Sequence, residues 1–235
     1  MNIGTVVEGE TDYLLLEAII LELFPTARLF PIQPTESGKG GWRDVQKWCQ
    51  ETWQRPGASL AQIISGQTGP KLDLLIIHVD ADIARQSNSD LQKNVTSPIT
   101  DVLQPCPPSV ETVDKLKQVV ARWLNFANLN ELPKEVILAI PSQDSENWLF
   151  AALFPDDDLC HQPNYECLHP SNSRKHPAYL LTLKKYGKVL RRKDGKIKKS
   201  KSRYKQVLSE VAKNWDRVCH ICSQAQVFND DLMAI

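Results

Sequence analysis

Carboxylate side chains follow two apolar runs of this sequence, each at the point where the run ends. Glu8 comes directly after the run 3–7, and Asp80 and Asp82 follow the run 74–79. A continuous apolar run is typical of a buried parallel strand, and open α/β sheets carry their chemistry just beyond the carboxyl ends of such strands. Converging carboxylates repel one another unless a hard cation lies between them. The pattern therefore predicts a Mg²⁺ or Mn²⁺ site at one edge of one sheet.

Two further carboxylates are candidates for the same site. Asp12 opens the helix expected after the first strand, and Glu146 opens a helix after a later short apolar strand. Each has a second explanation, because a carboxylate in the first turn of a helix also acts as a cap or favours the helix dipole. Asp144 competes with Glu146 for the same place. Asp80 and Asp82 are two residues apart, so on an extended backbone they face the same way and can share one ion.

Phosphodiester hydrolysis is a reaction that such a site would suit. It needs a nucleophilic water and a stabilised leaving oxygen, which one or two divalent ions supply. Glu8 is a candidate metal ligand and a candidate general base, and the sequence does not separate the two roles. His78 lies inside the second apolar run, where a core histidine is expected rather than a ligand.

The elements that position these residues form an α/β pattern. Apolar residues at helical spacing predict a helix over 12–24, and a strand is expected at 27–33, at a sheet edge because of Pro31. Further helices are expected at 43–52, at 109–129 and beyond the segment 142–146, which leads into a helix, and further strands are expected at 72–79 and 136–140. This order predicts a mostly parallel, Rossmann-like sheet with helices on both faces.

The chain divides into two expected parts. Residues 1–155 are predicted to form the catalytic domain, in which the polar, proline-marked stretch 85–108 is an insertion or flexible loop. Residues 156–235 are predicted to be a basic α-helical extension that packs on this core, with helices at 177–187 and 203–226.

Lysine and arginine are concentrated between residues 184 and 205, although the whole chain has 28 basic and 28 acidic residues and no net charge. Such a concentration suits contact with a phosphate backbone, which is sequence-blind and salt-sensitive; the alternative is a solvated loop. Tyr186 or Tyr204 is a candidate for stacking on a base. The glycine-rich loop 37–42 lacks P-loop spacing, and it either holds a phosphate or is a connector. The candidate nucleic-acid-binding residues are Lys39, Arg191, Arg192, Lys198, Lys199, Lys201 and Arg203.

Two motifs carry a resemblance to a known family. Residues 8–12, Glu-Gly-Glu-Thr-Asp after a strand, and residues 80–82, Asp-Ala-Asp after a later strand, resemble the Toprim domain over residues 1–155. The first motif is most similar to those of OLD-like and small standalone Toprim nucleases. The resemblance implies a further carboxylate near a serine, at Ser145-Glu146, and a downstream lysine at the scissile phosphate, at Lys199 or Lys201.

These expectations combine into a Toprim-like, divalent-metal-dependent nuclease that cuts DNA or RNA, with DNA preferred. The resemblance implies a role in phage or mobile-element defence. The expected metal ligands are Glu8, Asp12, Asp80, Asp82 and Glu146, and the expected catalytic residues are Glu8, Asp80, Asp82 and Lys201.

Two other functions stay open, and so do two kinds of partner. The first alternative is a non-catalytic Toprim module that binds nucleic acid or a partner in recombination or repair. The second is a metal-dependent phosphohydrolase that acts on a small nucleotide. OLD-type nucleases are usually joined to an ATPase domain, so an ATPase supplied in trans is a further hypothesis, as is a homo-oligomer.

Hydropathy and cysteine use bear on the compartment. No apolar stretch approaches the roughly 20 residues that span a bilayer, and the N-terminus enters a strand directly. A cytoplasmic protein with no membrane partner and with its six cysteines reduced is therefore expected. Cys160, Cys167, Cys219 and Cys222 admit a zinc site, but their spacing repeats no standard finger, and buried thiols are the favoured interpretation.

Overall fold

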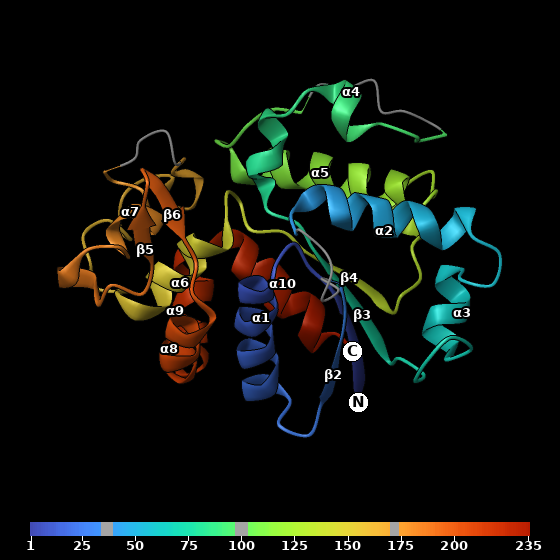
Figure 1. Ribbon diagram of the computed structural model, residues 1–235, viewed down its shortest axis with the longest axis horizontal. Coiled ribbons are helices and arrows are strands. Elements are labelled where there is room, and N and C mark those ends of the chain that lie inside the picture. The colour runs from blue at the N-terminus through green and yellow to red at the C-terminus, as the bar shows by residue number, and fades with distance from the viewer. Residues whose placement is uncertain (34–39, 97–102, 170–173) are drawn as a thin grey trace.

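Four parallel strands form a single sheet in the computed structural model, which describes residues 1–33, 40–96, 103–169 and 174–235. The strand order is β2-β1-β3-β4 (Figure 1). The strands are β1 (Asn2–Val6), β2 (Arg28–Gln33), β3 (Leu74–His78) and β4 (Val136–Ala139). Pro31 lies in β2 at the sheet edge, as expected of a residue that cannot donate a ladder hydrogen bond. The predicted parallel α/β sheet is confirmed.

Helices cover both faces of this sheet (Figure 1). One face packs against α2 (Trp42–Gln54), α3 (Leu60–Ser65) and α5 (Ser109–Trp123). The other packs against α1 (Glu10–Leu23), α6 (Ser145–Leu153), α8 (Lys201–Lys213), α9 (Trp215–Ile221) and α10 (Ser223–Met233). Ile76 and Ile77 of β3 point to opposite faces and join different core clusters. Burial on both sides is why β3 has a continuous apolar sequence.

The stretch 85–108 is more structured than expected in the part that is described. It follows the 3₁₀ helix η1 (Ala81–Arg85) and contains the short helix α4 (Asn88–Leu91). Leu91 is fully buried, and its carbonyl accepts a hydrogen bond from Trp123 Nε1 at 2.6 Å. This anchor in the core accounts for a helix where the sequence lacks periodicity.

The C-terminal part differs from the sequence prediction in three places. The helix expected at 203–226 is divided into α8, α9 and α10. The helix expected at 177–187 is reduced to α7 (Pro177–Leu180) and a 3₁₀ turn, η5 (Lys184–Tyr186). The basic segment forms an antiparallel hairpin, β5 (Arg191–Lys193) and β6 (Lys196–Lys198). Among the described residues, 3₁₀ turns are also found at η2 (Leu129–Glu131), before β4, and at η3 (Tyr165–Cys167).

One pair of cysteines is oxidised, so the expectation of six reduced thiols is wrong. Cys106 and Cys167 form a disulfide with a Cα–Cα distance of 5.2 Å. Cys219 and Cys222 are buried free thiols, as the sequence favoured. Within the described ranges, no helix combines the length and the apolar character needed to cross a membrane.

Candidate functional site

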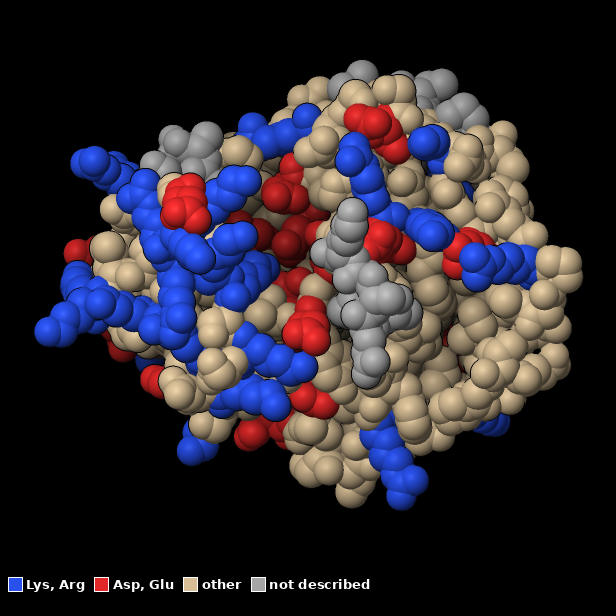
Figure 2. Space-filling model, in the orientation of Figure 1, with Lys and Arg blue, Asp and Glu red and all other residues tan. Residues whose placement is uncertain are grey.

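The strand ends bring the predicted carboxylates to one edge of the sheet. Backbone-to-carboxylate hydrogen bonds join the three loops that follow β1, β3 and β4. Glu8 Oε1 accepts the amide of Asp80 at 2.8 Å, and Asp80 Oδ1 accepts the amide of Ser145 at 3.1 Å. Figure 2 shows acidic side chains lining a hollow in the middle of this face, with Lys and Arg side chains gathered beside it. The loops thus fix the positions of Glu8 and Asp80.

A second group of contacts surrounds the ammonium of Lys199. Lys199 Nζ lies 2.8 Å from Glu146 Oε1 and 3.4 Å from Asp12 Oδ1. The same two oxygens accept hydroxyl hydrogen bonds, from Tyr204 to Glu146 at 2.6 Å and from Ser145 to Asp12 at 2.7 Å. Asp12 is therefore not a helix cap, since Gly9 is the N-cap residue of α1 and Asp12 points into the site.

Burial and mutual repulsion disfavour the ionised forms of Glu8, Asp80 and Asp82. Burial, with added repulsion from Asp12 and Asp82, raises the pKa of Glu8 to about 8. Burial and the charge of Glu8 raise the pKa of Asp80 well above its usual value. Burial and the neighbouring Asp144 raise the pKa of Asp82 to about 7. In each case the carboxylate form lacks a sufficient counter-charge.

The group around Lys199 is better balanced. Burial opposes ionisation of Asp12, but the Lys199 ammonium, His78 and the Ser145 hydroxyl together hold the pKa of Asp12 below its usual value. Burial raises the pKa of Glu146, and Lys199 counteracts this effect. The two carboxylates in turn hold the pKa of Lys199 well above its usual value in spite of burial. Lys199 thus contacts Asp12 and Glu146 directly, whereas it acts on Glu8, Asp80 and Asp82 only at longer range.

A buried histidine supports the loop between β4 and α6, and the sequence did not single it out. His176 is fully buried, and its Nδ1 accepts the amide of Ala178 at 3.2 Å. Its Nε2 therefore carries the proton and lies 3.1 Å from Asp144 Oδ2. A lone histidine before a proline gives no signal of this role in the sequence. His78 is a core residue as expected, and burial lowers its pKa to about 4.

The end of the glycine-rich loop rests on the backbone of Glu8. The amide of Gly41 donates to Glu8 O at 2.7 Å. Gly40 has φ +76°, and a Cβ there would lie 2.8 Å from the same oxygen. Lys39, a predicted nucleic-acid contact, lies outside the described residues.

Of the two candidate lysines, the structure favours Lys199 over Lys201 for a place at the carboxylates. Lys201 lies on the surface and pairs with Glu10 at 3.2 Å. Tyr204 is 1% exposed and bound to Glu146, so the prediction that it stacks on a base is wrong. Tyr186 is also buried, with its hydroxyl donating to Asp157 at 2.8 Å.

The remaining basic candidates lie on the surface near the hairpin. Arg191, Arg192 and Lys198 are exposed residues of β5 and β6. The guanidinium of Arg203 donates to the carbonyl of Lys188, which ties α8 to the segment before the hairpin.

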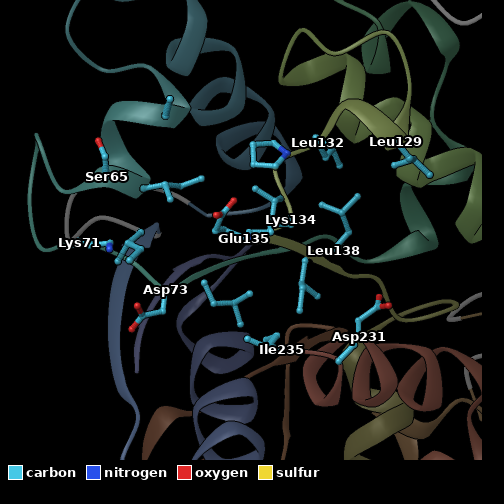
Figure 3. Close-up of a pocket in the computed structure, with 18 of the residues that line it drawn as sticks. Ser65, Lys71, Asp73, Leu129, Leu132, Lys134, Glu135, Leu138, Asp231 and Ile235 are labelled. Carbon is cyan, nitrogen blue, oxygen red and sulfur yellow. The ribbon is translucent and has the colours of Figure 1, made fainter.

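A separate cavity of about 1050 Å³ opens at the other end of the strands, away from the carboxylates (Figure 3). Side chains of both signs line it among apolar ones, including Lys71, Asp73, Lys134, Glu135 and Asp231. This mixture gives the cavity no preference for a polyanion, so it is not the predicted phosphate site.

Hard oxygen donors are present, but they are not arranged around a point. Among the described residues, no group of three or more His, Cys, Asp or Glu side chains is placed so as to hold a metal ion. Glu8, Asp80 and Asp82 nevertheless fit a hard divalent cation in donor type, and a bound cation would favour their ionised forms. Their side chains would have to turn toward a shared ion. The zinc alternative gains no support, because Cys167 is held in the disulfide.

Comparisons with known protein families, curated proteins and solved structures gave no match.

Proposed function

We propose that this protein is a divalent-metal-dependent phosphodiesterase that cuts nucleic acid, with DNA as the preferred substrate. The observation that supports it is that Lys199 contacts only some of the carboxylates of the site. Glu8, Asp80 and Asp82 follow adjacent strand ends, and their ionised forms lack a cation in direct contact among the described residues. The neighbouring carboxylates have Lys199 as their cation. A divalent ion can therefore enter beside Glu8, Asp80 and Asp82.

In this proposal the residues of the chain have distinct tasks. Glu8, Asp80 and Asp82 would hold the ion, which when bound supplies a nucleophilic water and stabilises developing charge on the phosphate. The amides of Asp80 and Ser145 keep two of these carboxylates in place. Lys199, whose side chain is 36% exposed, would present its ammonium to a phosphate oxygen beside the ion.

The ligand set is narrower than the sequence predicted. Asp12 and Glu146 have their nearer oxygens occupied by Lys199 and by hydroxyl donors. Their proposed task is to hold the lysine rather than the metal. The likeness of the two acidic motifs to Toprim nucleases supports this proposal. A cytoplasmic location, a role in defence, an ATPase partner in trans and a homo-oligomer remain hypotheses beside it.

Two alternatives make different predictions. A non-catalytic Toprim module would bind nucleic acid without cutting it, and would do so equally well without its carboxylates. A small-nucleotide phosphohydrolase would release phosphate from mononucleotides and leave polymers intact.

The test is a cleavage assay with a matched pair of variants. Plasmid, linear duplex, single-stranded DNA, RNA and mononucleotides are incubated with Mg²⁺ or Mn²⁺. Asp82→Asn is the informative variant, because the Asp82 carboxylate makes no hydrogen bond or ion pair to any described residue, so its loss spares the fold. Asp114→Asn removes an exposed carboxylate from α5 as the control.

The proposal expects metal-dependent cleavage of a polymer by the wild-type protein and by Asp114→Asn, and loss of cleavage in Asp82→Asn. Cleavage that persists in Asp82→Asn, or that needs no divalent ion, would contradict it. Binding without cleavage in all three proteins would favour the non-catalytic module.

A further inference from the structure

The β5–β6 hairpin carries four cations on one face. The register pairs Arg191 with Lys198 and Lys193 with Lys196, and all four residues are exposed. Side chains alternate between the faces of a strand, and cross-strand partners share a face, so these four point the same way. We call Arg191, Lys193, Lys196 and Lys198 the cationic face.

The opposite face of the hairpin is also exposed but makes one contact with the body of the protein. It carries Arg192, whose cross-strand partner is Ile197. The guanidinium of Arg192 lies over the ring of Tyr179, 5.8 Å from its centroid, so this arginine is engaged with the body of the protein. The turn between the strands is formed by Asp194 and Gly195, both with positive φ, which is typical of a two-residue hairpin turn. The hairpin thus has one face that contacts Tyr179 through Arg192 and one cationic face.

The cationic face is unfavourable for the protein by itself. Like charges directly opposite each other on paired strands destabilise a hairpin, and here both pairs of the cationic face are of that kind. Within the described residues, none of these four side chains has an acidic partner. A ligand that supplies several negative charges in a row would remove the repulsion at both pairs.

The hairpin also lies beside the acidic hollow. Lys199 follows β6 directly in the chain, and its ammonium reaches Glu146 at 2.8 Å. Figure 2 shows the Lys and Arg side chains of this region next to the hollow. A strand of phosphates held on the cationic face can therefore continue toward the carboxylates.

We propose that the cationic face binds the phosphate backbone of double-stranded DNA, an inference that rests on the proposed function for its choice of nucleic acid. Single-strand sites combine a basic groove with aromatic side chains on which bases stack. The segment 177–205 has three tyrosines, and two of them, Tyr186 and Tyr204, are buried. The third, Tyr179, is half-buried and has Arg192 over its ring, 5.8 Å from the centroid. The hairpin is a cationic β-ribbon without aromatic residues, which suits the regular phosphate backbone of a duplex. The major groove of B-DNA is wide enough to admit a two-stranded β-ribbon.

The test measures the salt dependence of binding in EDTA, so that no cleavage is needed. Fluorescence anisotropy follows a short fluorescein-labelled duplex and its isolated single strand over a range of NaCl concentrations. The quadruple variant changes the cationic face to glutamine, at Arg191, Lys193, Lys196 and Lys198. The control variant makes the same change in net charge at four exposed lysines elsewhere, Lys47, Lys71, Lys134 and Lys213.

The expected result has a defined size. Each phosphate contact contributes about 0.9 to the slope of log K against log salt for a duplex, and about 0.7 for a single strand. Loss of four contacts should therefore lower the duplex slope by about 3 to 4, and weaken binding at about 0.1 M salt by tenfold or more. The control variant should keep the wild-type slope to within about 1. The melting temperature of the quadruple variant should not fall, because its like-charge pairs are gone.

Three outcomes would overturn the inference: a slope equal to that of the control variant, tighter binding of the single strand than of the duplex, or binding of anionic lipid vesicles without binding of DNA. Failure of the proposed function gives a different result. Duplex bound through the cationic face but left intact with Mg²⁺ and Mn²⁺ would refute the nuclease and leave this interface standing.

Discussion

Replacing Lys199 by methionine removes the protein cation of the site while keeping a side chain of similar length. The ammonium lies 2.8 Å from Glu146 and 3.4 Å from Asp12, and both carboxylates are buried. Breaking a buried ion pair from one side costs about 3–5 kcal/mol. Because the Lys199 side chain is 36% exposed, solvent screening reduces the expected loss to about 1–3 kcal/mol at neutral pH.

The loss should depend on pH in a defined direction. Without Lys199, burial raises the pKa of Asp12 and Glu146 in the folded protein above the values in the unfolded chain. The folded variant then binds more protons than the unfolded chain, so it retains stability at low pH and loses it as the pH rises. The difference from the wild type should be small near about pH 4 and largest near about pH 8.

The assay is urea unfolding in EDTA at several pH values, with Lys201→Met as the control. Lys201 pairs with Glu10 on the surface, where such pairs contribute about 0–1 kcal/mol. Equal losses in the two variants, or a loss in Lys199→Met that does not change with pH, would refute this account of the site.

Three further changes test other parts of the structure. Folding raises the pKa of Glu8 from 4.5 to about 8, so the free energy of unfolding of the metal-free protein should fall as the pH rises between these two values. In Glu8→Gln, urea unfolding should show a free energy of unfolding that changes less with pH over the same range. Gly40→Ala should cost about 1–3 kcal/mol in urea unfolding, because φ is +76° and the Cβ would lie 2.8 Å from Glu8 O, whereas Gly69→Ala, with open space around it, should cost much less. Cys106→Ser should lower stability by about 2–4 kcal/mol, and a thiol reductant should lower the melting temperature of the wild type but not of this variant.

The sheet and its acidic edge could be predicted because they depend on local sequence. The run 74–79 is apolar except for His78 because β3 is buried on both faces, and its carboxylates follow directly. Parallel order then places the ends of β1, β3 and β4 at the same edge, which brings Glu8 near Asp80. No contact with distant residues had to be known.

The hairpin was missed although its turn has a recognisable sequence. Asp-Gly at 194–195 is a strong hairpin signal, but the strands beside it have only three residues each and are mostly charged. They lack the alternation of apolar and polar residues by which a strand is recognised. Their pairing leaves nearly all of their side chains in solvent.

The arrangement inside the site depends on tertiary contacts that no local pattern encodes. Asp12 fits a capping rule, yet it lies among Ser145 and Lys199, which are distant in sequence. The choice between Lys199 and Lys201 depends on where the hairpin joins α8. The disulfide links residues 61 positions apart, and cysteine spacing alone does not give such a pairing.

Manganese binding followed by electron paramagnetic resonance tests the metal site without any substrate. We expect the wild-type protein and Asp114→Asn to remove Mn²⁺ from the free-ion signal, excess Mg²⁺ to return it, and Asp82→Asn to bind Mn²⁺ far more weakly. Equal Mn²⁺ binding by Asp82→Asn and the wild type, or no binding by either, would show that these carboxylates do not form a metal site.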